Sequence, residues 1–180
     1  AQSLSKILLH LTFSTKKREP WIIPEIRPAL HAYLAGAVRS LNAEAYRVGG
    51  VADHVHLACT LPRTMPVSKL LEEIKRSSSS WIKQQAPLYH GFAWQAGYGA
   101  FSLGQSQLDA LISYIDRQEE HHRKRTFEEE YVEFLRRYGI DYDESTSGIE
   151  HNHVAPFQGL RLMGDFEPRV APAFGVLTLG

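Results

Sequence analysis

The segment Val51-Ala52-Asp53-His54-Val55-His56-Leu57-Ala58-Cys59 decides the fold expected of this chain. A β-strand places alternate side chains on opposite faces, so His54 and His56 are expected to leave the sheet on the same side. The intervening apolar side chains, Val55, Leu57 and Cys59, would then face a core. Two imidazoles on one surface form a candidate metal site that needs a third ligand; the alternative is a pair of hydrogen-bonded or partly exposed histidines.

Hydrophobic periodicity predicts the elements around this strand. Strands are expected at about 4–15, 44–48, 54–61 and 94–103, and helices at about 24–41 and 66–84. The pair Gly49-Gly50 permits a tight reversal between the second and third strands. The order of elements predicts an α+β fold, a ferredoxin-like split βαβ antiparallel sheet with helices on one face plus C-terminal helices. The other face, with both histidines, is expected to remain open.

The segment that follows the last predicted strand contains a second cluster of polar and titratable side chains. A third helix is expected from about Ser106 to Arg123, and it would place Tyr114 and Gln118 on one face at a spacing of four residues. A tyrosine can act as a covalent nucleophile when its target is made electrophilic, although most helical tyrosines are structural. The polar residues 119–122 are interpreted as solvated or supporting side chains. A fourth helix is expected from a capping box at Thr126 to Gly139.

Length and composition indicate one globular domain at residues 1–144 and a loosely ordered tail at 145–180, where glycines and prolines replace periodicity. The single cysteine, Cys59, excludes an intrachain disulfide framework and favours a reducing compartment. No apolar run approaches the roughly 20 residues of a membrane span, and the amino terminus has no signal-peptide pattern. We therefore expect a soluble, cytoplasmic protein without a membrane partner.

The charge distribution leaves room for a local basic surface. The formal net charge is zero, which argues against a uniformly basic coat for nucleic acid. Residues 128–144 are strongly acidic, so basic side chains are in excess in the rest of the chain. The cationic runs at 16–18 and 123–125 could contact phosphates, or they could be ordinary solvated surface.

Two motifs together resemble a known family. Residues 51–57 match the histidine-hydrophobe-histidine (HUH) motif, and residues 114–122, with Tyr114, Gln118, His121 and His122, resemble the tyrosine helix of the single-tyrosine HUH transposases. These are the transposases of small bacterial insertion sequences and their REP-associated relatives. The similarity extends over roughly residues 4–144, with further matches in residues 10–16 and 94–98. A lone HUH motif is weak evidence, but both motifs in order are specific.

The resemblance implies a metal-dependent single-strand DNA endonuclease and strand transferase. Such an enzyme would nick and rejoin single-stranded DNA beside hairpins at the ends of a mobile element. Carried over by residue, His54, His56 and Gln118 would hold Mg²⁺ or Mn²⁺, and Tyr114 would form a 5′-phosphotyrosine link. The family further implies a homodimer with composite active sites, in which the tyrosine of one subunit faces the histidine pair of the other.

Two alternatives from other classes remain open at this point. The first is a non-catalytic single-stranded nucleic-acid-binding domain, in which aromatic side chains on the open sheet face would stack on bases. The second is a metal-dependent phosphodiester hydrolase, in which the histidines would hold an ion that activates water and Tyr114 would be structural.

Overall fold

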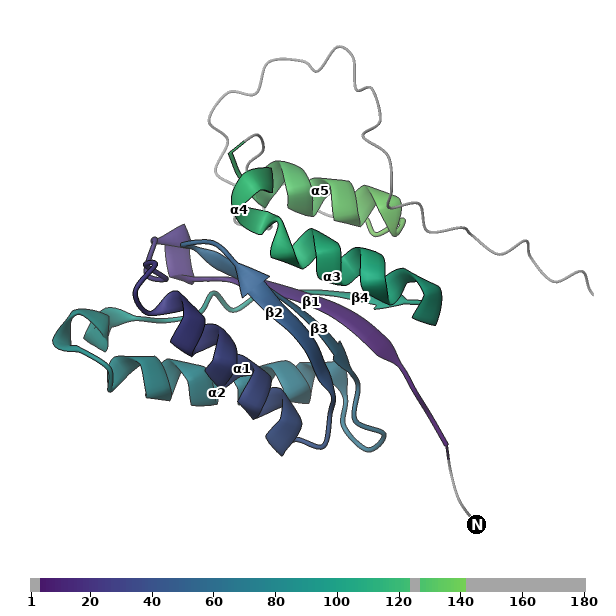
Figure 1. The fold of residues 1–180 in the computed structure, drawn as a ribbon, viewed down its shortest axis with the longest axis horizontal. Coiled ribbons are helices and arrows are strands. Elements are labelled where there is room, and N and C mark those ends of the chain that lie inside the picture. Colours follow the sequence, from purple (N-terminus) through teal and green to yellow (C-terminus); the bar gives the residue numbers. More distant parts are fainter. Residues whose placement is uncertain (1–3, 124–126, 142–180) are drawn as a thin grey trace, which may run out of the picture.

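A four-stranded antiparallel sheet forms the centre of the computed structural model, which describes residues 4–123 and 127–141 (Figure 1). The strands lie in the order β2-β3-β1-β4, so the two central strands are the first and the histidine strand. This order confirms the predicted ferredoxin-like arrangement. The strand bounds are β1 Leu8–Ser14, β2 Ala45–Gly50, β3 His54–Thr60 and β4 Gly99–Leu103.

Helices α1 (Arg27–Ser40) and α2 (Val67–Lys83) cover one face of this sheet. Their apolar stripes enclose the main core together with Val55, Leu57 and Cys59, which confirms the predicted inward side of the histidine strand. Short 3₁₀ turns at Lys16–Arg18, Pro87–Gly91 and Gln105–Gln107 connect the elements. No helix within the described residues is both long and apolar enough to cross a membrane.

The second face of the sheet is covered, so the expectation of an open histidine face was wrong. Helices α3 (Leu108–Asp116), α4 (Gln118–His121) and α5 (Phe127–Arg137) form a further layer on the side opposite α1 and α2 (Figure 1). The buried stripe of α3 packs on Leu8 and Ala58, and all of β1 is buried. The His54 and His56 side chains are 0% exposed. The covering layer forms because the sheet has apolar side chains on this face as well.

Glycine allows α3 to approach the sheet closely. A Cβ atom added at Gly49 would lie 2.5 Å from a methyl carbon of Ile115 and 2.9 Å from its carbonyl oxygen. Gly50 adopts a φ of +146°, which is accessible to glycine and strained for other residues. Both glycines belong to β2, and residues 51–53 make the reversal that was expected at Gly49-Gly50. The pair therefore serves helix packing as well as the hairpin.

Two other elements were predicted to be longer than they are. The expected third helix is interrupted at Arg117, whose amide donates to the Tyr114 carbonyl three residues earlier, so Tyr114 and Gln118 belong to consecutive helices. The expected strand at 94–103 begins only at Gly99, because Lys75 Nζ donates to carbonyls of residues 95–97 and holds them as a loop. The predicted cap at Thr126 and the tail at 145–180 lie outside the described residues.

The run of serines in α2 contains one buried member. Ser78 is 0% exposed, accepts a hydrogen bond from Trp94 Nε1 at 2.9 Å and donates to the Ile74 carbonyl at 2.7 Å. A larger side chain would collide with the indole. Close packing within the chain therefore explains the small residue at this position.

We predict that Ser78→Ala lowers the free energy of unfolding by about 1–3 kcal/mol, because the Trp94 indole N–H loses its acceptor inside the protein. Ser80→Ala is the matched control: it makes the same change in α2 at an exposed position and should shift stability by less than about 0.5 kcal/mol. Urea unfolding followed by circular dichroism measures both. Equal effects would contradict the assigned role of the Ser78 hydroxyl.

Candidate active site

The ring of His54 is held by an acidic neighbour. Its Nδ1 lies 2.7 Å from Asp53 Oδ1, and the other Asp53 oxygen accepts hydrogen bonds from Arg18. Burial alone would raise the pKa of Asp53, but the hydrogen bond and charge of His54 and the Arg18 guanidinium lower it to about 2. Asp53 therefore stays ionised and accepts the Nδ1 proton, which leaves His54 Nε2 as a potential ligand atom.

The ring of His56 is held by a different group. His10 of β1 places its Nε2 2.9 Å from His56 Nδ1, a diagonal contact across the sheet because Thr12 is directly opposite His56. Burial lowers the pKa of His10 to about 3, so this ring is neutral and can accept the Nδ1 proton of His56. Both histidines of the motif can thus present Nε2 toward the same space.

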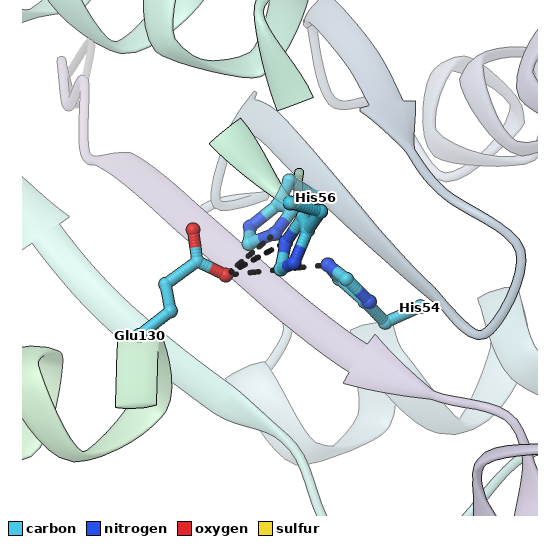
Figure 2. A group of neighbouring side chains, drawn as sticks. His54, His56 and Glu130 are labelled. Carbon is cyan, nitrogen blue, oxygen red and sulfur yellow. Dashed lines mark ion pairs between the residues drawn. The ribbon is translucent and has the colours of Figure 1, made fainter. Parts of the chain in front are cut away.

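Helix α5 and the end of α4 bring two more groups to that space. Glu130 Oε2 lies 3.5 Å from His56 Nε2, 4.0 Å from His54 Nε2 and 3.4 Å from His122 Nε2. Figure 2 shows the Glu130 carboxylate directed at the motif histidines. One ligand atom from each of the four residues lies within 4.8 Å of every other.

This donor set fits a transition metal ion. Ligand atoms about 2.0–2.2 Å from a tetrahedral ion are separated by roughly 3.4 Å. The Glu130 oxygen already lies 3.4 to 4.0 Å from the three imidazole nitrogens, and the whole set, within 4.8 Å, would contract around an ion. Imidazole nitrogen with one carboxylate suits Mn²⁺, Zn²⁺ and similar ions, whereas Mg²⁺ prefers oxygen ligands and retains water. The cluster therefore could hold the metal ion that was expected at the histidine pair. Of the two expected ions, Mg²⁺ and Mn²⁺, these donor atoms favour Mn²⁺.

Sequence reasoning did not identify Glu130 as a site residue. Burial, followed by the charge of Glu133, raises the pKa of Glu130 to about 8. In the sequence, Glu130 is spaced like the apolar positions Phe127, Tyr131 and Phe134 of the predicted fourth helix. An acidic residue within the apolar stripe of a helix is unusual, and this pattern could have identified Glu130 as a candidate site residue. His122, interpreted from sequence as a supporting or solvated residue, also belongs to the cluster.

Gln118, the third ligand expected from the resemblance, is also in this region. It begins α4, is 1% exposed, and donates from Nε2 to Glu130 Oε1 at 3.4 Å. It also contacts His54. The structure therefore brings Gln118 beside His54 and Glu130, although its helix is separate from that of Tyr114.

Tyr114, the expected nucleophile, lies beside the histidine pair of its own chain. Its ring centroid is 5.6 Å from that of His56 and 6.0 Å from that of His10, and the rings meet edge to face. Phe134 of α5 contacts the same tyrosine at 6.0 Å. The Tyr114 hydroxyl is buried. A single chain thus brings together the tyrosine, the histidines and Glu130.

The fold and this arrangement define the HUH tyrosine class, a ferredoxin-like sheet with a histidine pair on its central strand and a tyrosine on a following helix. The family model described as "Transposase IS200 like" matches residues 3–118. This chain therefore belongs to the IS200-like transposase family. No curated protein matches the chain significantly.

Two solved structures share the fold. One is a proposed transposase from Deinococcus radiodurans R1, with a TM-score of 0.50 and 19% identity over 66% of this chain and 95% of the other. The second is a REP-associated tyrosine transposase bound to a REP hairpin, with a TM-score of 0.51 and 16% identity over 68% of this chain and 72% of the other. At these identities the likeness concerns the fold.

We predict that Asp53→Asn weakens Mn²⁺ binding by roughly 10- to 100-fold, because His54 loses the carboxylate that fixes its tautomer and raises its basicity. Asp109→Asn removes a carboxylate from an exposed position of α3 and should leave the affinity unchanged. Isothermal titration calorimetry with MnCl₂ measures both variants. An unaltered affinity in Asp53→Asn would show that His54 does not bind the ion through the orientation described.

Proposed function

We propose that this transposase nicks and rejoins single-stranded DNA through a covalent tyrosine intermediate at Tyr114. The Tyr114 phenol would lose its proton and its oxygen would attack the scissile phosphorus. The bond from phosphorus to the 3′ oxygen would break, and the departing oxygen would take up a proton to become a 3′-hydroxyl, so the protons balance. The 5′ phosphate would remain on Tyr114. Rejoining reverses these steps, so the phosphotyrosine stores the bond and no nucleotide cofactor is required.

The observation that carries this proposal is the proximity of Tyr114 to the histidine pair. A nucleophile must lie within a few ångströms of its target. The ring centroids of Tyr114 and His56 are 5.6 Å apart, which supports a shared site for the tyrosine, the ion and the phosphate. His54, His56 and Gln118 would hold Mn²⁺ or Mg²⁺, with Asp53 and His10 orienting the histidine rings. When bound, the ion would polarise the phosphate and stabilise the developing charge.

The arrangement within one chain bears on the predicted dimer. A composite site requires Tyr114 of one subunit to reach the histidines of another, whereas here both groups are neighbours in the same subunit. We propose that one chain supplies both groups for the first cleavage step. A homodimer with composite sites stays a prediction.

A single-stranded DNA hairpin is the proposed substrate, with residues 1–144 as the nuclease domain. Support comes from the family and from the REP-associated relative, whose structure holds a REP hairpin. Lys16 and Lys17 are exposed and precede Arg18, which pairs with Asp53, the residue that contacts His54. They are therefore suited to contact phosphates near the site. Base recognition would use other groups.

We predict that Tyr114→Phe abolishes the covalent protein–DNA adduct and reduces cleavage to below roughly one thousandth of the wild-type rate, because phenylalanine has no nucleophilic oxygen. A denaturing gel after incubation with hairpin-bearing single-stranded DNA and Mn²⁺ measures both. Tyr138→Phe, which removes a hydroxyl from another tyrosine of the same helical layer, should retain the adduct.

Other outcomes of this assay support the alternatives. Cleavage by the wild type without an adduct, unaffected by Tyr114→Phe, would indicate the metal-dependent hydrolase. Binding without cleavage in the wild type would indicate the non-catalytic nucleic-acid-binding domain.

A further inference from the structure

Helix α5 carries a buried acid, Glu130, to the buried histidines. Glu130 is the only carboxylate among the described residues that is buried, with 4% of its side chain exposed. The acidic side chains of Glu129 and Glu133 in the same helix reach solvent. Burying a carboxylate is costly unless a cation or several hydrogen bonds compensate for lost water. The groups around the Glu130 carboxylate therefore bear on its role.

Amide and imidazole groups surround the Glu130 carboxylate. Gln118 donates a hydrogen bond of 3.4 Å to Oε1, and the Nε2 atoms of His122 and His56 lie 3.4 and 3.5 Å from Oε2. A divalent ion bound among these groups would stabilise the ionised carboxylate and take the imidazole nitrogens as ligands. The carboxylate oxygen and the imidazole nitrogens already converge at distances that suit such an ion.

Aromatic contacts also join α5, and Tyr138 just after it, to the sheet. Phe134 packs against His10 and Phe101 with centroid distances of 5.1 and 5.2 Å, and Tyr138 packs against Phe101 at 4.7 Å. Glu130 lies one helical turn before Phe134, so both side chains leave the same face of α5. An ion bound to Glu130 would add a direct link from this helix to strand β3.

We infer that Glu130 is a ligand of the metal ion in the DNA-free protein, and that the ion thereby fixes α5 over the histidines and Tyr114. This inference rests on the proposed function only in requiring an ion at His54 and His56. It assigns a ligand from α5, outside the two sequence motifs. Since the motif histidines and the Tyr114 hydroxyl are buried under this layer, a DNA phosphate reaches them only when α5 moves and a phosphate oxygen replaces the carboxylate.

The test compares Glu130→Gln with Glu133→Gln in the full chain. Both variants replace one carboxyl group of α5 by an amide and keep the side-chain shape. Glu130→Gln should weaken Mn²⁺ binding by at least about tenfold in calorimetry, and Glu133→Gln should not weaken it. Hydrogen exchange read by mass spectrometry gives the second readout: Mn²⁺ should slow exchange in residues 127–137 of the wild type and of Glu133→Gln, but not of Glu130→Gln.

Equal Mn²⁺ affinity in Glu130→Gln and wild type, or equal slowing of exchange in α5, would overturn the inference. Circular dichroism of the metal-free variants checks that both are folded. Failure of the proposed function is distinguishable, because the wild type would then bind Mn²⁺ without forming a DNA adduct. Absence of Mn²⁺ binding in the wild type would overturn this inference and the metal part of the proposal together.

Discussion

The site depends on two hydrogen bonds that the Nδ1 atoms of neighbouring imidazoles donate. Asp53, the residue before strand β3, fixes the His54 ring. His10 of the neighbouring strand β1 fixes the His56 ring. Strand alternation brings the two rings to one face, but it leaves each ring free to rotate. The two Nδ1 contacts remove that freedom and direct both Nε2 atoms toward Glu130. Without these contacts the two histidines would be buried polar side chains with no fixed orientation toward a common ion.

Burial explains why these contacts matter so much. The histidine face lies between the sheet and the layer of α3, α4 and α5, so its polar groups interact with one another and little with water. Electrostatic interactions strengthen in such surroundings, and unpaired charges become costly. The same layer that lets His54, His56 and Glu130 act as a set also separates the Tyr114 hydroxyl from solvent. The proposed chemistry thus requires a movement that admits the phosphate, and α5 is the element that covers it.

The sequence predicts the fold well because local patterns and topology agree. The alternation of residues 51–59 and the order of the first six elements suffice for a ferredoxin-like sheet, and the core on the α1 and α2 side follows from it. The covered histidine face was harder to predict. Leu8 and Ala58 are apolar residues on that face, but they predict a second layer only together with the apolar stripe of α3 that packs on them. That stripe is distant from both residues in the sequence.

The candidate site was predictable only in part for the same reason. His54 and His56 share a short motif, and Tyr114 and Gln118 share another, so local spacing finds them. His10 and Glu130 come from separate elements, and only the three-dimensional packing of β1 and α5 brings them to the histidines. An acid in the apolar stripe of α5 is a local signal for burial, but it does not identify the partner. The break at Arg117, where the amide donates to the Tyr114 carbonyl three residues earlier, is not predicted by hydrophobic periodicity.

The most direct measurement is a crystal structure of the full chain with Mn²⁺, in which anomalous scattering locates the ion. The account predicts one strong peak within about 2.3 Å of Nε2 of both His54 and His56, with Tyr114 of the same chain beside it. A peak bound through Nδ1, an ion remote from the two histidines, or a Tyr114 ring that has moved away from His56 would contradict it.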